Sequence, residues 1–305
     1  MKHIVWKPAH LSIIMPVHLF SHGDIGLVRR AVSSVLRQSS PDWELIISPD
    51  DAQNDLYKKL FDFDPRIKIV PNDGTPPGSG PAETRNRAMR SGLVTGHYVV
   101  NLDHDDTVDE KFVSSILSYF SSNPQAVSAC FTTGYSTGDG CVLRWMWRHD
   151  TMTINDFSSM LGSMPAVVRK DKFPRYQDTF AEDVIHTCRA IDLNGGRVDI
   201  IHDAHYRIFL HPDSFSNRIK KKAGGDYLSI IESPREVYPG WSEQGFLSMK
   251  RLFEHRLHVN NLFVSQRTIS NYHVFIVNHR LVNTDGKSIP LREESVKGKD
   301  LINVG

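Results

Sequence analysis

"HYVVNLDHDD", residues 97–106, joins a run of strand-forming residues to a cluster of acidic ones. Residues 98–102 have the mostly apolar, β-branched character of a buried strand, and Asp103, Asp105 and Asp106 follow directly. Three carboxylates within four residues repel one another, so a fold that gathers them at a strand end needs a positive charge there. A divalent cation is the first candidate for that charge.

The hundred residues before this stretch alternate between strand and helix patterns. "LSIIMPV" (11–17) predicts a buried strand, and 24–38 has apolar residues at helical spacing. Two further strands are predicted at 43–48 and 66–70, and a short helix at 80–92 precedes the acidic strand. This alternation predicts an α/β fold with a doubly wound, mostly parallel sheet.

Polar residues follow each of the four predicted strands. In an open parallel sheet, ligands bind in the crevice outside the carboxyl ends of the strands. We therefore expect four clusters to converge on one site: Pro16-Val17-His18, Pro49-Asp50-Asp51, Pro71-Asn72-Asp73 and Asp103-His104-Asp105-Asp106.

The rest of the chain divides into two parts by its composition. Helices are predicted at 109–120 and 180–196, with a strand at 126–132 between them. From residue 216 the chain begins with a basic run, Arg218–Lys222, and continues into a long helical pattern. We expect a catalytic domain over 1–215 and a partly helical C-terminal extension over 216–305.

Composition limits the possible classes of protein. The 305 residues are 40% hydrophobic and carry a formal net charge of +1, so the chain is globular and no strong field attracts nucleic acid. Three cysteines without CxxC spacing argue against a disulfide framework or a zinc site and favour a reducing, cytoplasmic location. No apolar run approaches the roughly 18 residues of a membrane span, so we expect any membrane contact to be peripheral, through Arg218–Lys222.

Four segments, in order, resemble the motifs of the family 2 glycosyltransferases, inverting enzymes with the GT-A fold. They are SIIMPV (12–17), AVSSVLRQSSPDWELIISPDD (31–51), ETRNRAMRSGLVTGHYVVNLDHDD (83–106) and AEDV (181–184). A D-x-D alone occurs by chance in many loops, whereas the ordered set is specific. The resemblance covers roughly residues 10 to 215.

The resemblance implies a metal site at the acidic cluster. Asp105, the last residue of D-x-D, would bind Mn²⁺ or Mg²⁺, and Asp103 would contact the metal or the ribose. Hard divalent cations prefer such carboxylate oxygens. Asp106 is the next-best ligand. His211 is the candidate third ligand, with His202 and His205 as its competitors.

The resemblance also implies a donor site and a general base. A carboxylate of Asp50 or Asp51 would accept the uracil N–H, and Asp183 of the E-D pair would take the proton of the acceptor hydroxyl. Acceptor contacts are expected from Glu182 and from the aromatic side chains of Trp145 and Trp147, which would share one face of a strand. The remaining donor contacts are expected from Pro16, Val17, His18, Arg85 and His104.

The leading hypothesis is a metal-dependent inverting glycosyltransferase, a hexosyl- or N-acetylhexosaminyltransferase that uses a UDP-sugar. Its acceptor would be a glycan, lipid-linked or other hydroxyl in cell-surface glycan or lipopolysaccharide synthesis. A nucleotidyltransferase would need a glycine-rich loop after the first strand, which PVHLFSHGDIG (16–26) does not supply. A non-catalytic sugar-nucleotide binding protein is the third possibility, and it would need neither Asp183 nor a metal.

Overall fold

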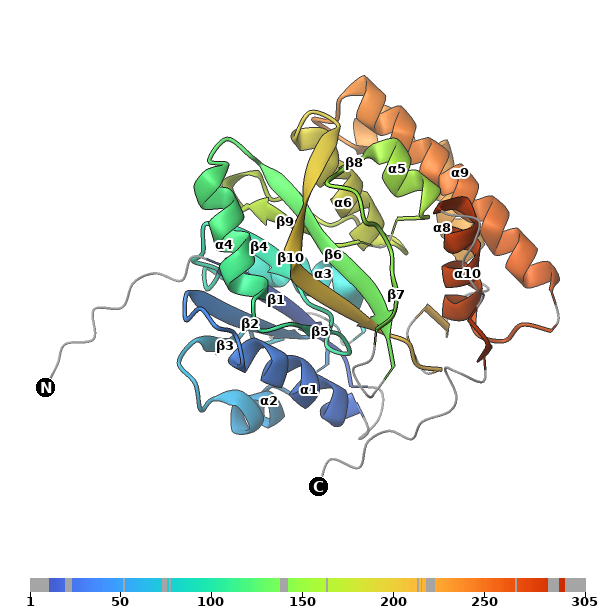
Figure 1. Ribbon diagram of the computed structural model, residues 1–305. Helices are drawn as coiled ribbons and strands as arrows, with labels where there is room; N and C mark the ends of the chain where they lie inside the picture. The colour runs from blue at the N-terminus through green and yellow to red at the C-terminus, as the bar shows by residue number, and fades with distance from the viewer. Residues whose placement is uncertain are drawn as a thin grey trace, which may run out of the picture.

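The computed structural model shows an α/β fold with helices packed on both faces of one twisted sheet (Figure 1). It describes residues 11–19, 24–51, 53–72, 76, 78–137, 142–162, 164–212, 214, 216–217, 223–266, 268–284 and 291–293. Asp73, Cys141 and the basic run Arg218–Lys222 lie outside these ranges.

The described strands form one ten-stranded sheet in the order β3-β2-β1-β4-β9-β6-β10-β5, with β7 paired to β6 and β8 to β10. The bounds are β1 (Leu11–Val17), β2 (Trp43–Pro49), β3 (Ile67–Ile69), β4 (Tyr98–Asn101), β5 (Thr107–Val108), β6 (Ser128–Ser136), β7 (Val142–Trp145), β8 (Thr151–Thr153), β9 (Ala166–Arg169) and β10 (Arg197–Phe209).

The predicted parallel half of the sheet is confirmed. β1 pairs in parallel with both β2 and β4, and β2 pairs in parallel with β3. β9 runs antiparallel between β4 and β6, and β10 then pairs in parallel with β6. The strands β1, β2 and β4 therefore end at the same edge of the sheet, where ligands of such folds bind.

Helices follow the strands as the alternating pattern predicts. Those expected at 24–38, 80–92, 109–120 and 180–196 are confirmed within a few residues, and the long helical pattern after residue 240 is also a helix. The bounds are α1 (Asp24–Leu36), α2 (Asn54–Phe61), α3 (Gly80–Arg90), α4 (Phe112–Ser122), α5 (Ile154–Ser159), α6 (Glu182–Leu193), α8 (Ala223–Glu232), α9 (Glu243–Ser265) and α10 (Tyr272–Thr284), with 3₁₀ turns η1 (Lys170–Lys172) and η2 (Arg235–Val237).

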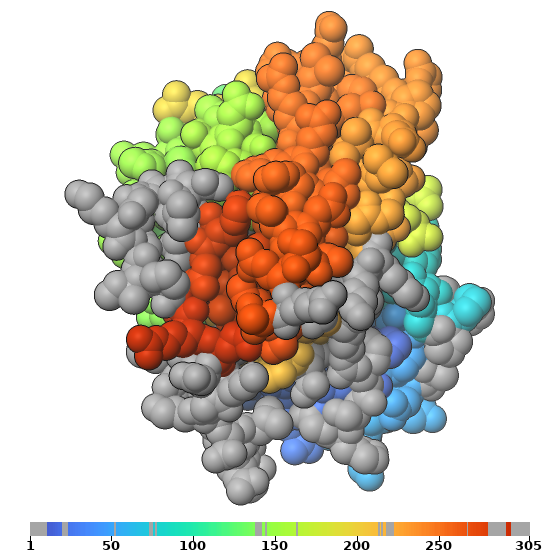
Figure 2. Space-filling view, turned by 90° about the vertical axis from the view of Figure 1, so that its right-hand side faces the viewer, coloured from blue at the N-terminus to red at the C-terminus, as the bar shows by residue number. Residues whose placement is uncertain are grey.

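The C-terminal helices share a hydrophobic core with α6. Cys188 and Ile191 of α6 lie in one buried cluster with Tyr227 of α8 and with Met249 and Phe253 of α9. Figure 2 shows α9 and α10 side by side on one face of the molecule. The division of the chain at residue 215 stays a prediction, since this core joins both sides of it.

A polar contact fixes the start of α9 against α6. The Asp192 carboxylate accepts hydrogen bonds from the Ser242 hydroxyl and, at 3.1 Å, from the Ser242 amide. The Ser242 hydroxyl in turn accepts from the Gly245 amide at 2.9 Å and so caps the helix. A Cβ atom on Gly245 would lie 2.2 Å from the Asp192 Oδ1 atom, so only glycine allows this approach.

Glu44 forms a buried polar network away from the edge where β1, β2 and β4 end. Its carboxylate accepts bonds from the Ser12 hydroxyl at 2.5 Å, the Lys68 ammonium at 2.5 Å, and the Thr95 amide and hydroxyl at 2.5 and 2.8 Å. Burial alone would raise the pKa of Glu44, but the bonds from Lys68, Ser12 and Thr95 lower it below its usual value.

We expect Glu44→Gln to lower the free energy of unfolding by ~3 kcal/mol at pH 7, because it leaves the Lys68 ammonium without its buried partner. The ionised carboxylate stabilises the fold above the unfolded-state pKa of about 4.3, and this stability is lost as the pH falls through the lower folded-state pKa. Urea unfolding at pH 7 and at pH 3 should therefore show a smaller difference at the lower pH. Glu83→Gln, in an exposed pair with Arg90, is the matched control and should change stability by less than ~0.5 kcal/mol. Equal effects of the two substitutions would contradict the prediction.

Candidate active site

A cleft of about 400 Å³ opens at the carboxyl ends of β1, β2 and β4. It brings together most of the side chains that the sequence singled out, as expected for an open parallel sheet. The predicted residues that line it are Pro16, Val17, His18, Asp50, Arg85, Asp103, His104, Asp105, Asp106, Glu182, Asp183 and His211.

Asp50, next after β2, has one carboxylate oxygen engaged and one without a partner. Its Oδ2 atom accepts from the Gly80 amide at 3.0 Å and lies 3.2 Å from the His18 Nδ1 atom. Its Oδ1 atom is buried and has no hydrogen-bond partner among the described residues. Because buried polar atoms are normally paired, this oxygen is an unused acceptor at the cleft wall.

Asp51 does not line the cleft. Its carboxylate accepts from the Tyr57 hydroxyl at 2.7 Å, the Leu19 amide at 3.2 Å and the Gln53 amide at 2.9 Å. These bonds hold the loops after β1 and β2 in place. Asp50 and Asp51 were the two residues predicted to accept a hydrogen bond from the uracil base. The geometry favours Asp50 and argues against Asp51.

Asp105 and His211 lie side by side in the lining of the cleft. The Asp105 Oδ2 atom lies 3.0 Å from the His211 Nε2 atom. Burial would raise the pKa of Asp105, but the hydrogen bond with His211 and the charges of His104 and His211 lower it below its usual range. His211 reaches the cleft because it lies two residues past the end of β10.

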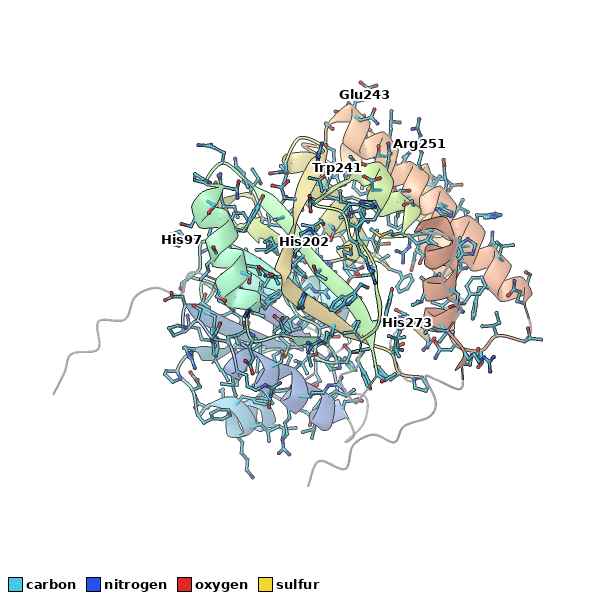
Figure 3. All side chains as sticks on the ribbon, viewed as in Figure 1. His97, His202, Trp241, Glu243, Arg251 and His273 are labelled. Carbon is cyan, nitrogen blue, oxygen red and sulfur yellow. The ribbon has the colours of Figure 1, made fainter. Side chains whose placement is uncertain are left out.

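The competitors of His211 lie elsewhere on β10. His202 pairs with Asp150 at 2.9 Å, and His205 pairs with Asp109 at 2.8 Å. Neither lines the cleft. Figure 3 shows His202 well away from His273 of α10, which does line it. Of the three candidate histidines, only His211 is therefore placed beside the acidic cluster.

Asp106 has a structural position. Its Oδ1 atom accepts from the Phe209 amide and its Oδ2 atom from the Tyr206 hydroxyl, both at 2.8 Å. Burial and the charges of Asp105 and Asp103 raise the pKa of Asp106 well above its usual value. Because both oxygens are engaged by β10, this residue fixes the acidic cluster to that strand and is not the next-best ligand that the sequence suggested.

The donor set fits a hard divalent cation in part. Adjacent ligands of an octahedral Mg²⁺ or Mn²⁺ lie about 3 Å apart, which matches the 3.0 Å between the Asp105 and His211 atoms. Among the described residues, no group of three or more acidic, histidine or cysteine side chains is already arranged to hold a metal ion. The residues that fit are thus Asp105 and His211, and a contribution from Asp103 stays a prediction.

Arg85 joins the acidic cluster to α6 from beneath the cleft. Its Nη2 atom donates to the Asp103 Oδ1 atom at 2.6 Å, and its Nη1 atom donates to the Glu182 carboxylate. The side chain is only 4% exposed, and its guanidinium lies 5.2 Å from the ring centroid of Tyr176. A direct approach of Arg85 to a nucleotide stays a prediction, whereas its bridging position is observed.

The adjacent residues Glu182 and Asp183 point in different directions, as residues about 100° apart on a helix must. Glu182 is 6% exposed, and burial raises its pKa to about 7, with Arg85 opposing the shift and Asp183 adding to it. Asp183 is exposed and lines the cleft at the N-terminal end of α6, where the helix dipole favours a negative charge. Asp183 is therefore the carboxylate available to a ligand. Glu182 is paired with Arg85, so its predicted contact with an acceptor sugar stays a prediction.

Trp145 and Trp147 do not form the predicted aromatic face. β7 ends at Trp145, so Trp147 lies beyond the strand, and its indole N–H donates to the Thr151 carbonyl at 3.0 Å. The Trp147 side chain packs on the core of the second half of the sheet. Neither tryptophan lines the cleft, and their stacking on an acceptor stays a prediction that this geometry does not support.

The C-terminal helices supply a wall of the cleft that the sequence did not reveal. Its residues come from α9 and α10, far along the chain from the motifs. No local signal marked them, because their pattern is that of an ordinary amphipathic helix. These residues are Arg256, Tyr272, His273 and Ile276.

Comparisons with known proteins agree with this geometry. Residues 12–191 match the model of the family described as Glycosyl transferase family 2. The chain is 34% identical over 97 residues to the Escherichia coli UDP-Glc:alpha-D-GlcNAc-diphosphoundecaprenol beta-1,3-glucosyltransferase WfgD, covering 32% of this chain and 35% of that protein. It is 29% identical over 180 residues to Bacillus subtilis TuaG, provisionally named a teichuronic acid biosynthesis glycosyltransferase, covering 56% of this chain and 66% of that protein.

Solved structures share the fold over most of the chain. The structure of Staphylococcus aureus TarS, residues 1–349, in complex with UDP-GlcNAc superimposes with a TM-score of 0.56 at 12% identity. The superposition covers 90% of this chain and 81% of that one. The likeness therefore extends past the matched family segment into the C-terminal helices.

We expect Arg85→Met to lower the free energy of unfolding by ~3–5 kcal/mol, because it leaves the buried Glu182 carboxylate without its cation. In a Glu182→Gln background the same substitution should cost at least ~1 kcal/mol less, since the carboxylate is no longer charged. Urea unfolding of the two single variants and the double variant measures this difference. Arg90→Met, which removes an exposed arginine of the same helix, is the control and should have almost no effect. Additive effects of the two substitutions would show that the bridge is not an energetic unit.

Proposed function

Because the chain belongs to glycosyl transferase family 2 and has the GT-A fold, we propose that it transfers a sugar from a nucleotide diphosphate sugar to a hydroxyl acceptor with inversion. One observation carries the proposal. A single cleft is lined by Asp50, which has one unpartnered carboxylate oxygen, by the Asp105–His211 pair and by the exposed Asp183. These three features correspond to base recognition, diphosphate binding and general base catalysis.

UDP is the proposed nucleotide of the donor. The uracil ring has one N–H donor on its pairing edge, and the unused Oδ1 atom of Asp50 is an acceptor. Pro16, Val17 and His18 line the cleft next to Asp50 and would surround the base. The similarity to TarS, solved with UDP-GlcNAc, supports this choice.

Asp105 and His211 would hold Mn²⁺ or Mg²⁺, with Asp103 and His104 close by on the same strand end. The cation would supply Lewis acid chemistry by neutralising the negative charge of the departing nucleoside diphosphate. The chain itself places the two ligands 3.0 Å apart and buries Asp106 behind them.

Asp183 is the proposed general base. Its carboxylate takes the proton from the acceptor hydroxyl as the acceptor oxygen forms a bond to the anomeric carbon. The bond from that carbon to the diphosphate oxygen breaks on the opposite face, and the diphosphate leaves with the electron pair. The products are the glycosylated acceptor, the nucleoside diphosphate and a protonated Asp183, which returns its proton to water.

Cell-surface polysaccharide synthesis is the proposed setting, with a glycan or a lipid-linked sugar as acceptor. The names of WfgD and TuaG support it, although the matched segments span only about a third and two thirds of those proteins. A hexosyl or N-acetylhexosaminyl group is the sugar proposed to be transferred.

Within the described ranges, no helix combines the length and apolar character needed to cross a membrane. Peripheral contact through Arg218–Lys222 stays a prediction.

Membership of the family argues against a nucleotidyltransferase. The exposed Asp183, the proposed general base, argues against a non-catalytic sugar-nucleotide binding protein. A measurement of nucleotide-sugar turnover, with Mn²⁺ or with EDTA, separates the three. Metal-dependent release of UDP supports the proposal. Release of pyrophosphate from UTP incubated with a sugar 1-phosphate would favour a nucleotidyltransferase. Absence of turnover in both assays, with retained binding, would favour a binding protein.

We expect Asp183→Asn to lower the transfer rate by a factor of ~10²–10⁴, because the amide keeps the shape but takes no proton. Affinity for UDP and Mn²⁺ should stay within about twofold of wild type. Asp105→Ala should instead weaken the binding of UDP only when metal is present. Initial rates and calorimetry measure both effects, and Asp55→Asn, an exposed first-turn aspartate of α2, is the matched control. Near-normal transfer by Asp183→Asn would remove that residue from the role of base.

We expect UDP to bind at least about tenfold more tightly than CDP, since cytosine lacks the N–H that Asp50 would accept. Asp50→Asn should weaken UDP binding and leave CDP binding almost unchanged, which makes CDP the internal control. The closest rival of UDP is dTDP, because thymine carries the same N–H. A strong preference for GDP in calorimetry would overturn the assignment of Asp50.

A further inference from the structure

Asn217 connects the segment that carries His211 to helix α10. Its side-chain Nδ2 atom donates to the His211 carbonyl at 3.1 Å. Its Oδ1 atom accepts from the Tyr272 amide at 2.7 Å and from the His273 amide at 3.4 Å. The Asn217 side chain is 9% exposed. Its amide nitrogen binds the segment that carries His211, and its amide oxygen binds the start of α10.

The start of α10 explains why such a contact is stable. The first N–H groups of a helix have no partner within the helix. Asn217 satisfies the first two of them from a distant part of the chain, while Asn271 caps the same helix locally by accepting from the Val274 amide at 3.1 Å. Only Asn217 also reaches His211.

Ser214 adds a second connection between the same two segments. Its amide donates to the His211 carbonyl at 3.4 Å, and its carbonyl accepts from the Asn217 amide at 3.0 Å. Its hydroxyl lies 3.4 Å from the His273 Nδ1 atom. The His211 carbonyl is therefore fixed by two donors, and both of them also contact α10 or the residue that caps it.

We propose that Asn217 is a positioning residue that sets the affinity of the Asp105–His211 pair for a divalent cation. The inference rests on the proposed function, in which this pair holds Mn²⁺ or Mg²⁺. His211 lies beyond the last residue of β10, so strand pairing does not fix its backbone. The anchor to α10 takes over that task and holds the His211 ring 3.0 Å from Asp105.

The competing explanation is that Asn217 only stabilises the start of α10. Asn271 allows the two roles to be separated, because its side chain caps the same helix end by accepting from the Val274 amide and not by a bond to the His211 segment. Loss of either cap should lower the free energy of unfolding by ~0.5–2 kcal/mol. Only loss of Asn217 should also change metal affinity.

The test measures Mn²⁺ binding to the full chain by the electron paramagnetic resonance of free Mn²⁺, with and without saturating UDP. Asn217→Ala should raise the dissociation constant by about 10- to 100-fold, the usual cost of losing a residue that orients a metal ligand. In a His211→Ala background the same substitution should change it less than twofold, because Asn217 acts through His211. Asn271→Ala should leave it unchanged.

The outcomes separate this inference from the proposed function. Wild-type Mn²⁺ affinity in Asn217→Ala, together with weak binding in His211→Ala, would overturn the role of Asn217 and leave the metal site standing. Wild-type Mn²⁺ affinity in His211→Ala would overturn both the role of Asn217 and the proposed metal site. Equal weakening in Asn271→Ala and Asn217→Ala would assign the effect to the helix end and also overturn the inference.

A second variant covers the case in which Asn217→Ala does not fold. Asn217→Asp keeps an acceptor for the two amides of α10 but loses the donor to the His211 carbonyl. Its added negative charge favours cation binding, an effect that 0.5 M KCl largely screens. Weaker Mn²⁺ binding than wild type in that salt supports the inference, and equal or tighter binding contradicts it.

Discussion

The buried guanidinium of Arg85 is the interaction on which the candidate site depends. It joins Asp103, at the end of β4, to Glu182, at the start of α6. A buried cation between two carboxylates is stable only when its geometry is fixed, so the strand end and the helix are held in one arrangement. The exposed direction of Asp183 follows from this, since its neighbour is committed to Arg85.

The three clustered carboxylates coexist because each has a different partner. Asp103 is neutralised by Arg85, Asp105 faces His211, and Asp106 is held by hydrogen bonds from β10. Asp105 and Asp103 both line the cleft, and the Asp103 side chain is 45% exposed there. Repulsion that would oppose folding is thus divided among an arginine, a histidine and a strand end.

The sequence predicted which side chains meet at the strand ends much better than which helices cover them. Strand ends in a parallel sheet share an edge, so Asp50 and Asp105 could be placed together from the pattern alone. The choice between Asp50 and Asp51, or between Glu182 and Asp183, depended on contacts with Tyr57 and Arg85 that no local pattern encodes. The wall from α9 and α10 was missed for the same reason, since helical periodicity shows that a face is buried but not what it covers.

The contact between Asp192 and Ser242 has a consequence for the shape of the cleft. The segment matched to the family ends at residue 191, and the next residue fixes the start of α9. The matched segment and the C-terminal helices therefore meet at a polar contact, beside a glycine that leaves no room for a side chain. A side chain at position 245 would push the start of α9 away from Asp192, and Arg256 of the same helix lies in the wall of the cleft. A substitution far from the cleft would in this way alter one of its walls.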